Sequence, residues 1–267
     1  MLGKLEVLLS CMYQKDTSVI EQSNLQNVKT LVINQTNEDC IINQECSNGS
    51  KLISTIERGV SNSRNMAITN ATGECCLFAD DDEFFVDDVA DIIVDEFEKH
   101  PEVDIMIFKI SNFPKGQRNC FYRMKRLDLL KVASVQIAIK LSSVKGRVWF
   151  DEKLGAGTIN QAGEENKFLL DCYKAGLNIS YTPVEIGALR DSESTWFSGF
   201  SEKYFFTRGK ILRYILGLPL TTLYNIYFVL TKQSLYKSNI SPYKALKHLM
   251  IGSLTKDIDK EFMRNSK

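Results

Sequence analysis

Short apolar runs alternate with helix-like segments along the first half of the chain. A continuous apolar run of four to eight residues is typical of a buried strand, whereas a helix shows apolar residues three or four positions apart. The pattern predicts strands over 5–9, 29–33, 75–79 and 103–107, and helices over 18–27, 61–69 and 87–100. Strands and helices that alternate in this way indicate an α/β fold with a mostly parallel sheet.

The pattern changes after residue 111. Residues 132–140 alternate only weakly between apolar and polar positions, which predicts a strand at a sheet edge or in a small hairpin. Residues 163–175 have the spacing of a helix that ends at Gly176. A short strand is expected over 178–181, closed by Pro183.

The C-terminal quarter is the most apolar part of the chain. The 17 residues from Tyr214 to Leu230 carry no charge, but Gly217 and Pro219 interrupt them, and a spanning helix needs about 20 apolar residues. Aromatic and basic side chains are mixed here, which suits helices lying in the headgroup region of a membrane. Two core-packed helices with lysines extending to solvent are the alternative. We therefore divide the chain into a domain over 1–198 and a helical extension over 199–267.

Charge strengthens this division. The 33 basic and 33 acidic side chains cancel, yet residues 203–247 hold eight basic residues and no acidic one. Such a stretch favours an anionic partner, and its apolar character points to a membrane surface rather than nucleic acid. The seven cysteines have no regular spacing, and the first residues lack the pattern of a signal peptide. Free thiols and a cytoplasmic location are expected.

Three consecutive aspartates, Asp80, Asp81 and Asp82, directly follow the predicted strand 75–79. Carboxylates crowded at a strand end repel each other, which costs stability unless a cation compensates. Ligand sites of parallel sheets lie at that end of the strands, and hard oxygen ligands favour Mg²⁺ or Mn²⁺. A solvated acidic turn before the 87–100 helix is the simpler alternative. The strand-end position favours a metal site.

Other chemistries that use strand-end or clustered aspartates fit the sequence less well. A phosphatase of the haloacid-dehalogenase type would carry a small side chain where Phe84 stands. An EF-hand loop would need a central glycine and a terminal glutamate, and both are absent here. A nucleotidyltransferase would show a glycine-rich loop after the first strand, and none follows Leu9.

Motifs on both sides of the triplet define a resemblance. They are Gly59-Val-Ser-Asn-Ser-Arg64-Asn65, Ala71-Thr-Gly73-Glu and Leu77-Phe-Ala-Asp80-Asp81-Asp82, followed later by Phe150-Asp151-Glu152, Gly155-Ala-Gly157-Thr and Gly163-Glu164-Glu165-Asn166. In content and spacing they resemble glycosyltransferase family 2 over about residues 4–200, with details of bacterial capsule or surface-polysaccharide enzymes. The resemblance implies the GT-A fold and a hexosyltransferase that inverts the anomeric centre of a nucleotide-activated sugar.

The resemblance also implies roles for the acidic residues. Asp80 and Asp82 correspond to the Asp-x-Asp pair, with Asp82 holding Mn²⁺ or Mg²⁺ on the diphosphate, and Asp80 and Asp81 would contact ribose or metal-bound water. The family's catalytic base is the second residue of a Glu-Asp pair, which matches Glu165 after Glu164. This chain has Glu in place of Asp, one methylene longer. Alternatively, the two glutamates only stabilise the start of their helix.

The nucleotide would meet residues of the first strands. The resemblance implies that Arg64 faces the nucleotide and that Ser10 lies beside the base. Where relatives carry acidic residues that read uracil, this chain has Asn34 and Gln35. Amides form hydrogen bonds with a pyrimidine edge as carboxylates do, so a UDP-sugar is the preferred donor, although the departure weakens that choice.

Fewer residues are candidates for binding the acceptor. The histidine that many relatives place after the last strand is missing, and Arg190 is the candidate to hold phosphate there. Trp196 is a candidate to stack on an acceptor sugar. The expected acceptor is a glycan, carried on polyprenyl diphosphate, at the inner face of the cell membrane. A non-catalytic glycan- or membrane-binding protein that keeps the fold is the alternative from another class.

Overall fold

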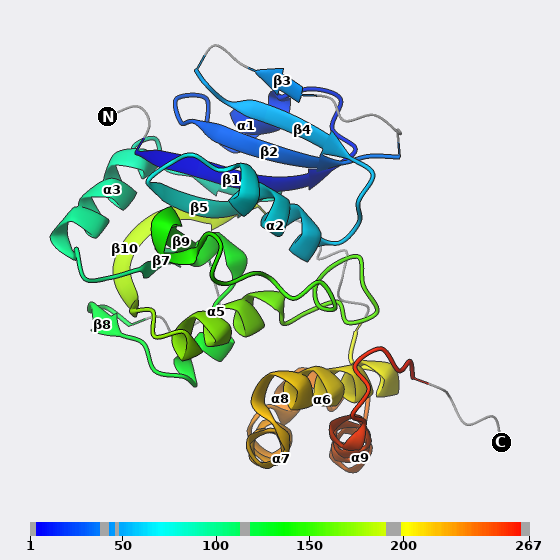
Figure 1. Ribbon diagram of the computed structural model, residues 1–267. Helices are drawn as coiled ribbons and strands as arrows, with labels where there is room; N and C mark the ends of the chain where they lie inside the picture. The colour runs from blue at the N-terminus through cyan, green and yellow to red at the C-terminus, as the bar shows by residue number, and fades with distance from the viewer. Residues whose placement is uncertain (1–3, 38–42, 46–47, 113–117, 191–198, 263–267) are drawn as a thin grey trace. The chain divides into compact units, whose positions relative to one another are not determined.

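The structure, a computed structural model, describes residues 4–37, 43–45, 48–112, 118–190 and 199–262. The chain divides into two units (Figure 1). The first comprises residues 1–151 and 165–192, and the second comprises residues 152–164 and 193–267.

The first unit is built on one sheet. Its order is β3-β4-β2-β1-β5-β9-β7-β10-β6, with β8 paired to β10. The strands are β1 (Leu5–Met12), β2 (Thr30–Gln35), β3 (Asn43–Glu45), β4 (Lys51–Thr55), β5 (Cys75–Asp80), β6 (Glu83–Phe85), β7 (Ile105–Ile110), β8 (Tyr122–Arg123), β9 (Ile137–Lys140) and β10 (Ile179–Leu189). Neighbours β4, β2, β1 and β5 are parallel, as are β7 and β10. Because β9 is antiparallel to both β5 and β7, all six of these strands run in one direction, which confirms the predicted mostly parallel α/β sheet.

Helices cover both faces of this sheet. They are α1 (Ser18–Gln22), α2 (Val60–Asn70), α3 (Val89–Lys99), α4 (Leu141–Val144) and α5 (Glu164–Lys174), with short 3-10 helices over Asp128–Lys131 and Ser134–Gln136. Leu77 and Ala79 of β5 share a core with buried residues of α1 and α3. Phe78 lies between them and so points to the opposite face, where its ring contacts Phe168 of α5 edge-on.

Two predictions about strands were wrong. The weak strand predicted over 132–140 is β9, and it lies in the middle of the sheet between β5 and β7 instead of at an edge. The strand predicted to stop at Pro183 continues to Leu189. Its pairing with β7 slips between Tyr181 and Glu185, and this irregular segment accommodates a residue that has no N–H to donate.

Other boundaries differ less. The predicted helix over 18–27 is only five residues long, and the sequence pattern did not predict β3, β4, β6 or β8. The strands Leu5–Met12, Thr30–Gln35 and Cys75–Asp80 and the helices Val60–Asn70, Val89–Lys99 and Glu164–Lys174 confirm the corresponding predictions to within a few residues.

Four helices dominate the second unit: α6 (Glu202–Leu216), α7 (Leu218–Thr231), α8 (Gln233–Tyr236) and α9 (Pro242–Leu254). The apolar stretch 214–230 is divided by Gly217, whose φ of 79° ends α6. The backbones of α6 and α9 approach closely at two glycines. A Cβ on Gly209 would lie 2.1 Å from the Leu249 carbonyl oxygen, and one on Gly252 would lie 2.0 Å from that of Phe206. Among the described residues, none of the helices combines the length and apolar character that crossing a bilayer requires.

Candidate functional site

The parallel strands bring several predicted site residues to one edge of the sheet. Ser10 of β1 lies beside Asp80 of β5 in the strand register, and Cys11 lies beside Asn34 of β2. The carboxyl ends of β1, β2, β4 and β5 therefore meet there, with the aspartate triplet in the turn that follows β5. Ligand sites of α/β sheets form at such edges.

Asp80 is held from two sides. The Nη2 atom of Arg64 lies 3.1 and 2.9 Å from the two carboxylate oxygens of Asp80. The Ser134 hydroxyl donates a hydrogen bond of 3.1 Å to Oδ2 of Asp80. The Arg64 side chain is only 2% exposed, whereas that of Asp80 is 29% exposed. The guanidinium is thus buried against Asp80 and fixes its orientation, while its expected contact with a nucleotide stays a prediction.

Asp81 and Asp82 are exposed at the strand end. Partial burial, followed by the charge of Asp80, raises the pKa of both carboxyl groups above the ordinary aspartate value. A raised pKa means that the ionised form is disfavoured where the three carboxylates crowd together. A divalent cation would relieve this repulsion. The donor set fits such an ion, because Mg²⁺ is commonly held by one or two carboxylates together with substrate phosphates.

Within the described residues, no group of three or more histidine, cysteine, aspartate or glutamate side chains is placed so that it could hold a metal ion by itself. A cation at the triplet would therefore depend on phosphate or water for its remaining ligands. Sites that bind metal together with a phosphorylated substrate have this incomplete protein shell. The arrangement suits a metal that arrives with a diphosphate better than a permanent structural metal.

Glu83 braces the turn and was missed by the sequence analysis. Its side chain is buried, and its Oε2 atom accepts a hydrogen bond of 3.0 Å from the Asp80 backbone N–H. Burial, and then the charge of Asp80, raises the pKa of Glu83 well above the ordinary glutamate value. Burial thus disfavours the ionised form of Glu83, whose hydrogen bond to the Asp80 backbone supports the turn. As the next residue in an acidic run, it gave no signal of its own burial.

The Arg64-Asn65 pair connects the triplet to α5. The Arg64 guanidinium lies over the Phe150 ring, 5.5 Å from its centroid, and Phe150 stacks on Phe168 of α5 at 4.2 Å. Asn65 exchanges two hydrogen bonds with the Phe150 backbone, of 3.0 and 2.8 Å. Phe168 lies one turn after Glu165, on the same side of the helix. These contacts hold α5 against the face of β5 that leads to Asp80.

The predicted catalytic base, Glu165, lies at the start of α5. Gly163, with a φ of 89°, precedes the helix, and Glu164 and Glu165 form its first turn. Glu164 is buried, whereas Glu165 is half-buried. The first turn of a helix stabilises negative charge, so the position suits a carboxylate. The role of these two glutamates in catalysis remains a prediction.

The side chains predicted to contact the nucleobase form hydrogen bonds within the protein. Asn34 is 2% exposed, and its amide exchanges hydrogen bonds of 2.8 and 2.9 Å with the Gln14 backbone. The Gln35 amide donates to the Gly59 carbonyl at 2.9 Å, and the Ser10 hydroxyl accepts from the Ser63 hydroxyl at 2.8 Å. These side chains therefore brace the loops of the site, and their direct contact with a nucleotide stays a prediction.

The acceptor-side candidates are only partly described. The Arg190 backbone N–H donates to the Asp82 carbonyl at 2.9 Å, which joins the end of β10 to the aspartate turn. Its guanidinium donates to the Gln22 carbonyl. Trp196 lies outside the described residues. Arg190 thus lies beside the triplet, although the phosphate contact expected of it is untested.

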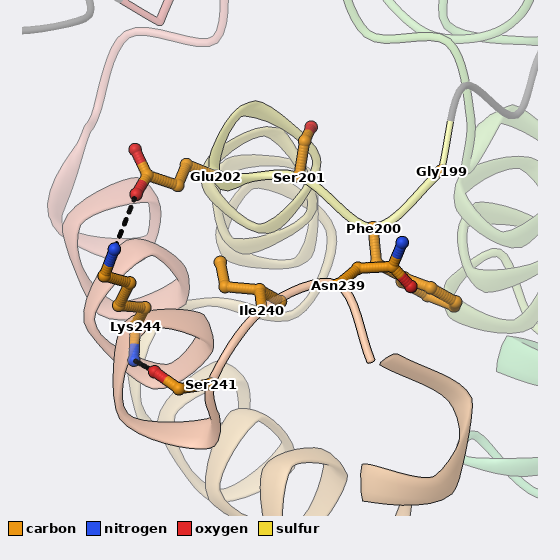
Figure 2. A pocket seen from close by; sticks show the side chains of 8 residues that line it. All are labelled: Gly199, Phe200, Ser201, Glu202, Asn239, Ile240, Ser241 and Lys244. Atoms are coloured by element: carbon orange, nitrogen blue, oxygen red, sulfur yellow. Dashed lines mark hydrogen bonds and ion pairs between the residues drawn. The ribbon is translucent and has the colours of Figure 1, made fainter. Parts of the chain in front are cut away.

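The second unit contains a cavity of about 560 Å³ that includes none of the predicted site residues. The N-terminal ends of α6 and α9 line it (Figure 2). Glu202 faces Lys244 across 3.9 Å and His248 across 3.6 Å. Because the charges at this cavity are largely balanced within the protein, it is a weaker candidate site than the strand-end triplet.

Comparison with known proteins supports the resemblance of the first unit to glycosyltransferase family 2. The family model "Glycosyl transferase family 2" matches residues 17–142. No curated protein matches the sequence. Among solved structures, S. aureus TarS 1-349 in complex with UDP-GlcNAc is similar with a TM-score of 0.60 at 16% identity, over 88% of this chain and 74% of that one.

The chain is also similar to a second solved structure. The mannosyltransferase PcManGT from Pyrobaculum calidifontis, in complex with GDP-Man and Mn²⁺, has a TM-score of 0.52 at 14% identity, over 94% of this chain and 74% of that one. Identities this low show the fold alone, and the fold agrees with the GT-A architecture expected from the sequence. Together with the family match, the fold supports a glycosyltransferase family 2 domain of the GT-A type that includes residues 17–142.

Proposed function

We propose that the protein is an inverting, metal-dependent hexosyltransferase that transfers a sugar from a nucleoside-diphosphate donor, preferably a UDP-sugar, to a glycan acceptor. The observation that carries the proposal is the aspartate triplet. It lies at the carboxyl edge of a parallel sheet, with Asp80 fixed by Arg64 and Ser134 and with Asp82 exposed. A site of this kind leaves a cation accessible to an incoming diphosphate.

Asp82 and Asp80 would hold Mn²⁺ or Mg²⁺. Asp80 already accepts from Arg64 and Ser134, so Asp82 would be the principal ligand, and Asp80 and Asp81 would contact ribose or water at the ion. The cation would supply charge neutralisation for the nucleoside diphosphate as it leaves the sugar. Solved relatives with UDP-GlcNAc and with GDP-Man and Mn²⁺ support a nucleotide-sugar donor.

Glu165 would act as the catalytic base. Its carboxylate would take the proton of the acceptor hydroxyl, whose oxygen attacks the anomeric carbon while the bond to the diphosphate breaks on the opposite side. One displacement inverts the anomeric centre. Glu164, which is buried beside it, would orient the first turn of α5. The contacts of α5 with Phe150 and Phe78 support a fixed position for this helix.

The acceptor would be a polyprenyl-diphosphate-linked glycan of bacterial surface-polysaccharide synthesis. Of the eight basic residues between 203 and 247, with no acidic residue among them, Lys210 is buried, and the other seven support peripheral attachment to the inner face of the cell membrane. Each basic residue near an anionic surface contributes about 1 kcal/mol to binding. Membrane attachment would bring the first unit to an acceptor that cannot leave the lipid.

A donor screen tests this proposal. Purified protein with Mn²⁺ would be incubated with a panel of UDP- and GDP-sugars, and release of the nucleoside diphosphate would be measured. We expect one donor to be hydrolysed, with turnover lost in Glu165→Gln while donor binding is retained. Asp91→Asn, an exposed carboxylate on α3, is the matched control and should behave as wild type.

The outcomes separate the alternatives. If Glu165→Gln turned over the donor at the wild-type rate, Glu165 would not be the base. If no nucleotide sugar bound with the metal present, the transferase proposal would fall and a non-catalytic protein with the GT-A fold would remain.

A further inference from the structure

The exposed face of α7 is apolar along its whole length. The helix carries no charged side chain between Leu218 and Thr231. Four large apolar residues are exposed on it: Leu223 at 66%, Ile226 at 42%, Tyr227 at 55% and Leu230 at 68%. Their spacing of three, one and three positions places them on one side of the helix. We call these four residues the α7 stripe.

The buried side of the same helix is partly polar. Thr221 and Asn225 are both 0% exposed, and the Asn225 amide donates a hydrogen bond of 2.8 Å to the Ser253 hydroxyl of α9. Phe228 and Val229 are buried beside them in the apolar core of the unit, so α7 is apolar on both its buried and its exposed side. A helix on a water-facing surface exposes polar residues instead. The exposed stripe therefore indicates a surface that meets an apolar medium.

The charges next to the α7 stripe indicate which medium. Arg213 precedes α7, and the exposed lysines Lys232 and Lys237 follow it, with no acidic residue anywhere from 203 to 247. If the stripe packed on a second copy of itself, either helix orientation would bring basic groups onto basic groups. An anionic lipid surface instead pairs with both ends of the helix and accepts the apolar side chains between them.

We propose that the α7 stripe inserts into the headgroup region of an anionic membrane, with α7 lying flat on the surface. At 1.5 Å per residue, its 14 residues extend about 21 Å, which is shorter than the roughly 30 Å hydrocarbon core. Tyr227 suits the interface because its ring is apolar and its hydroxyl is polar. This inference deepens the proposed function, on whose membrane-bound acceptor it rests, by assigning the surface that binds the lipid.

Vesicle co-sedimentation of the full chain tests the proposal without any donor or metal. The probes are vesicles of phosphatidylcholine alone and vesicles with 30% phosphatidylglycerol. The double variant Leu223→Glu with Leu230→Glu removes the stripe at positions where glutamate is a good helix former. Leu127→Glu, at a leucine of the first unit that is 59% exposed, is the matched control.

We expect wild type and Leu127→Glu to bind the anionic vesicles at least tenfold more tightly than the neutral ones. Each stripe substitution should weaken binding by roughly tenfold, since a leucine side chain is no longer transferred from water. The double variant should keep the wild-type melting temperature and its binding of nucleotide sugar. Lys232→Glu with Lys237→Glu should reduce the preference for anionic vesicles.

Several results would overturn the proposal. One is a wild-type protein that does not bind anionic vesicles, and another is a double variant that binds them as tightly as Leu127→Glu does. A wild-type dimer that the double variant dissociates, with no vesicle binding, would assign the stripe to a second copy of the chain. Because vesicle binding and donor binding are measured separately, loss of one with the other intact shows whether this inference or the proposed function has failed.

Discussion

Two helices of the molecule, α3 in the first unit and α7 in the second, expose opposite kinds of side chain. Both bury apolar residues with a few polar ones: Val89, Ile93 and Phe97 with Glu96 in α3, and Phe228 and Val229 with Thr221 and Asn225 in α7. On its other side α3 exposes charged residues, whereas α7 exposes leucine, isoleucine and tyrosine. Both helices bury about one face, so the difference lies in what the other face meets. The surface of α3 is made for water, whereas that of α7 is made for an apolar partner.

The contrast extends to the two units. The first unit places its unusual polar groups around the aspartate triplet, where Arg64, Ser134 and Glu83 fix one carboxylate and leave others exposed. The second unit has no comparable cluster in its described residues, and its unusual feature is an apolar surface flanked by lysines. Chemistry and attachment are thus assigned to different units, and each should be removable without the other.

The largest expected effect is a loss of donor turnover, without loss of membrane binding, on substitution in the aspartate triplet. Asp82→Ala removes the principal metal ligand, so metal-dependent donor turnover should fall by about 10³-fold or more, as expected when charge stabilisation of the leaving group is lost. Binding to anionic vesicles should stay at the wild-type level. Turnover is measured by release of nucleoside diphosphate, and retained turnover in this variant would remove Asp82 from the metal site.

The next largest effect concerns the ion pair between Arg64 and Asp80. Arg64→Ala leaves the Asp80 carboxylate without its buried partner, and we expect the free energy of unfolding to fall by about 2–3 kcal/mol. Donor affinity should fall as well, because Asp80 and the Phe150 ring both lose a contact. Urea denaturation and calorimetry measure the two effects. Arg147→Ala, an exposed arginine, is the control, and equal losses in both variants would argue against a role for the Arg64–Asp80 pair.

A smaller effect on stability compares the buried and exposed sides of the two helices. Asn225→Ala removes the hydrogen bond to Ser253 and should lower the free energy of unfolding by about 1–2 kcal/mol. Leu223→Ala on the same helix should cost less than about 0.5 kcal/mol. In α3 the apolar position matters more than the polar one. Ile93→Ala should lower the free energy of unfolding by about 2–5 kcal/mol, and Asp91→Ala should leave it almost unchanged. Urea denaturation of the four variants decides whether the exposed leucine of α7 contributes as little to folding as the exposed aspartate of α3.

The smallest effect is a pH dependence in the second unit. Burial lowers the pKa of His248 below its ordinary value of 6.5; Glu202 opposes this shift, and Lys247 and Lys244 add to it. The unfolded chain therefore takes up the proton more readily, so the stability contributed by neutral His248 is present above about pH 6.5 and is lost as the pH falls below it. The melting temperature should fall less between pH 7.5 and 5 in His248→Gln than in wild type. Parallel curves would contradict the prediction.

The local parts of this architecture could be predicted from the sequence. The apolar run 75–79 and the aspartates after it are neighbours in the chain, so the strand and its acidic end are visible together. Gly176 marks the end of α5 in the same way. The alternation of such segments was enough to predict a mostly parallel α/β sheet, because connections between parallel strands leave a repeating pattern.

The remaining features depend on contacts between distant residues. Nothing near residues 137–140 shows that β9 enters the middle of the sheet, because a weak alternating pattern does not specify its partners. Ser134 reaches Asp80 across 54 positions of sequence, and no local signal marks it. The sequence motif marks Arg64 as a site residue. Its burial against Asp80 depends on the packing of α2 on the sheet, which no local pattern shows. Likewise, the apolar character of residues 214–230 is visible in the sequence, but which side of α7 is buried depends on its packing in the second unit.

Calorimetric titration of nucleotide sugars into the wild-type protein, with and without Mn²⁺, tests the central claim most directly. UDP-GlcNAc, other UDP-sugars and GDP-Man form the panel. We predict saturable binding of at least one donor, tightened by Mn²⁺, with the metal dependence absent in Asp82→Ala. Donor binding that is the same with and without Mn²⁺, or no binding of any donor, would contradict a metal-dependent glycosyltransferase site at the aspartate triplet.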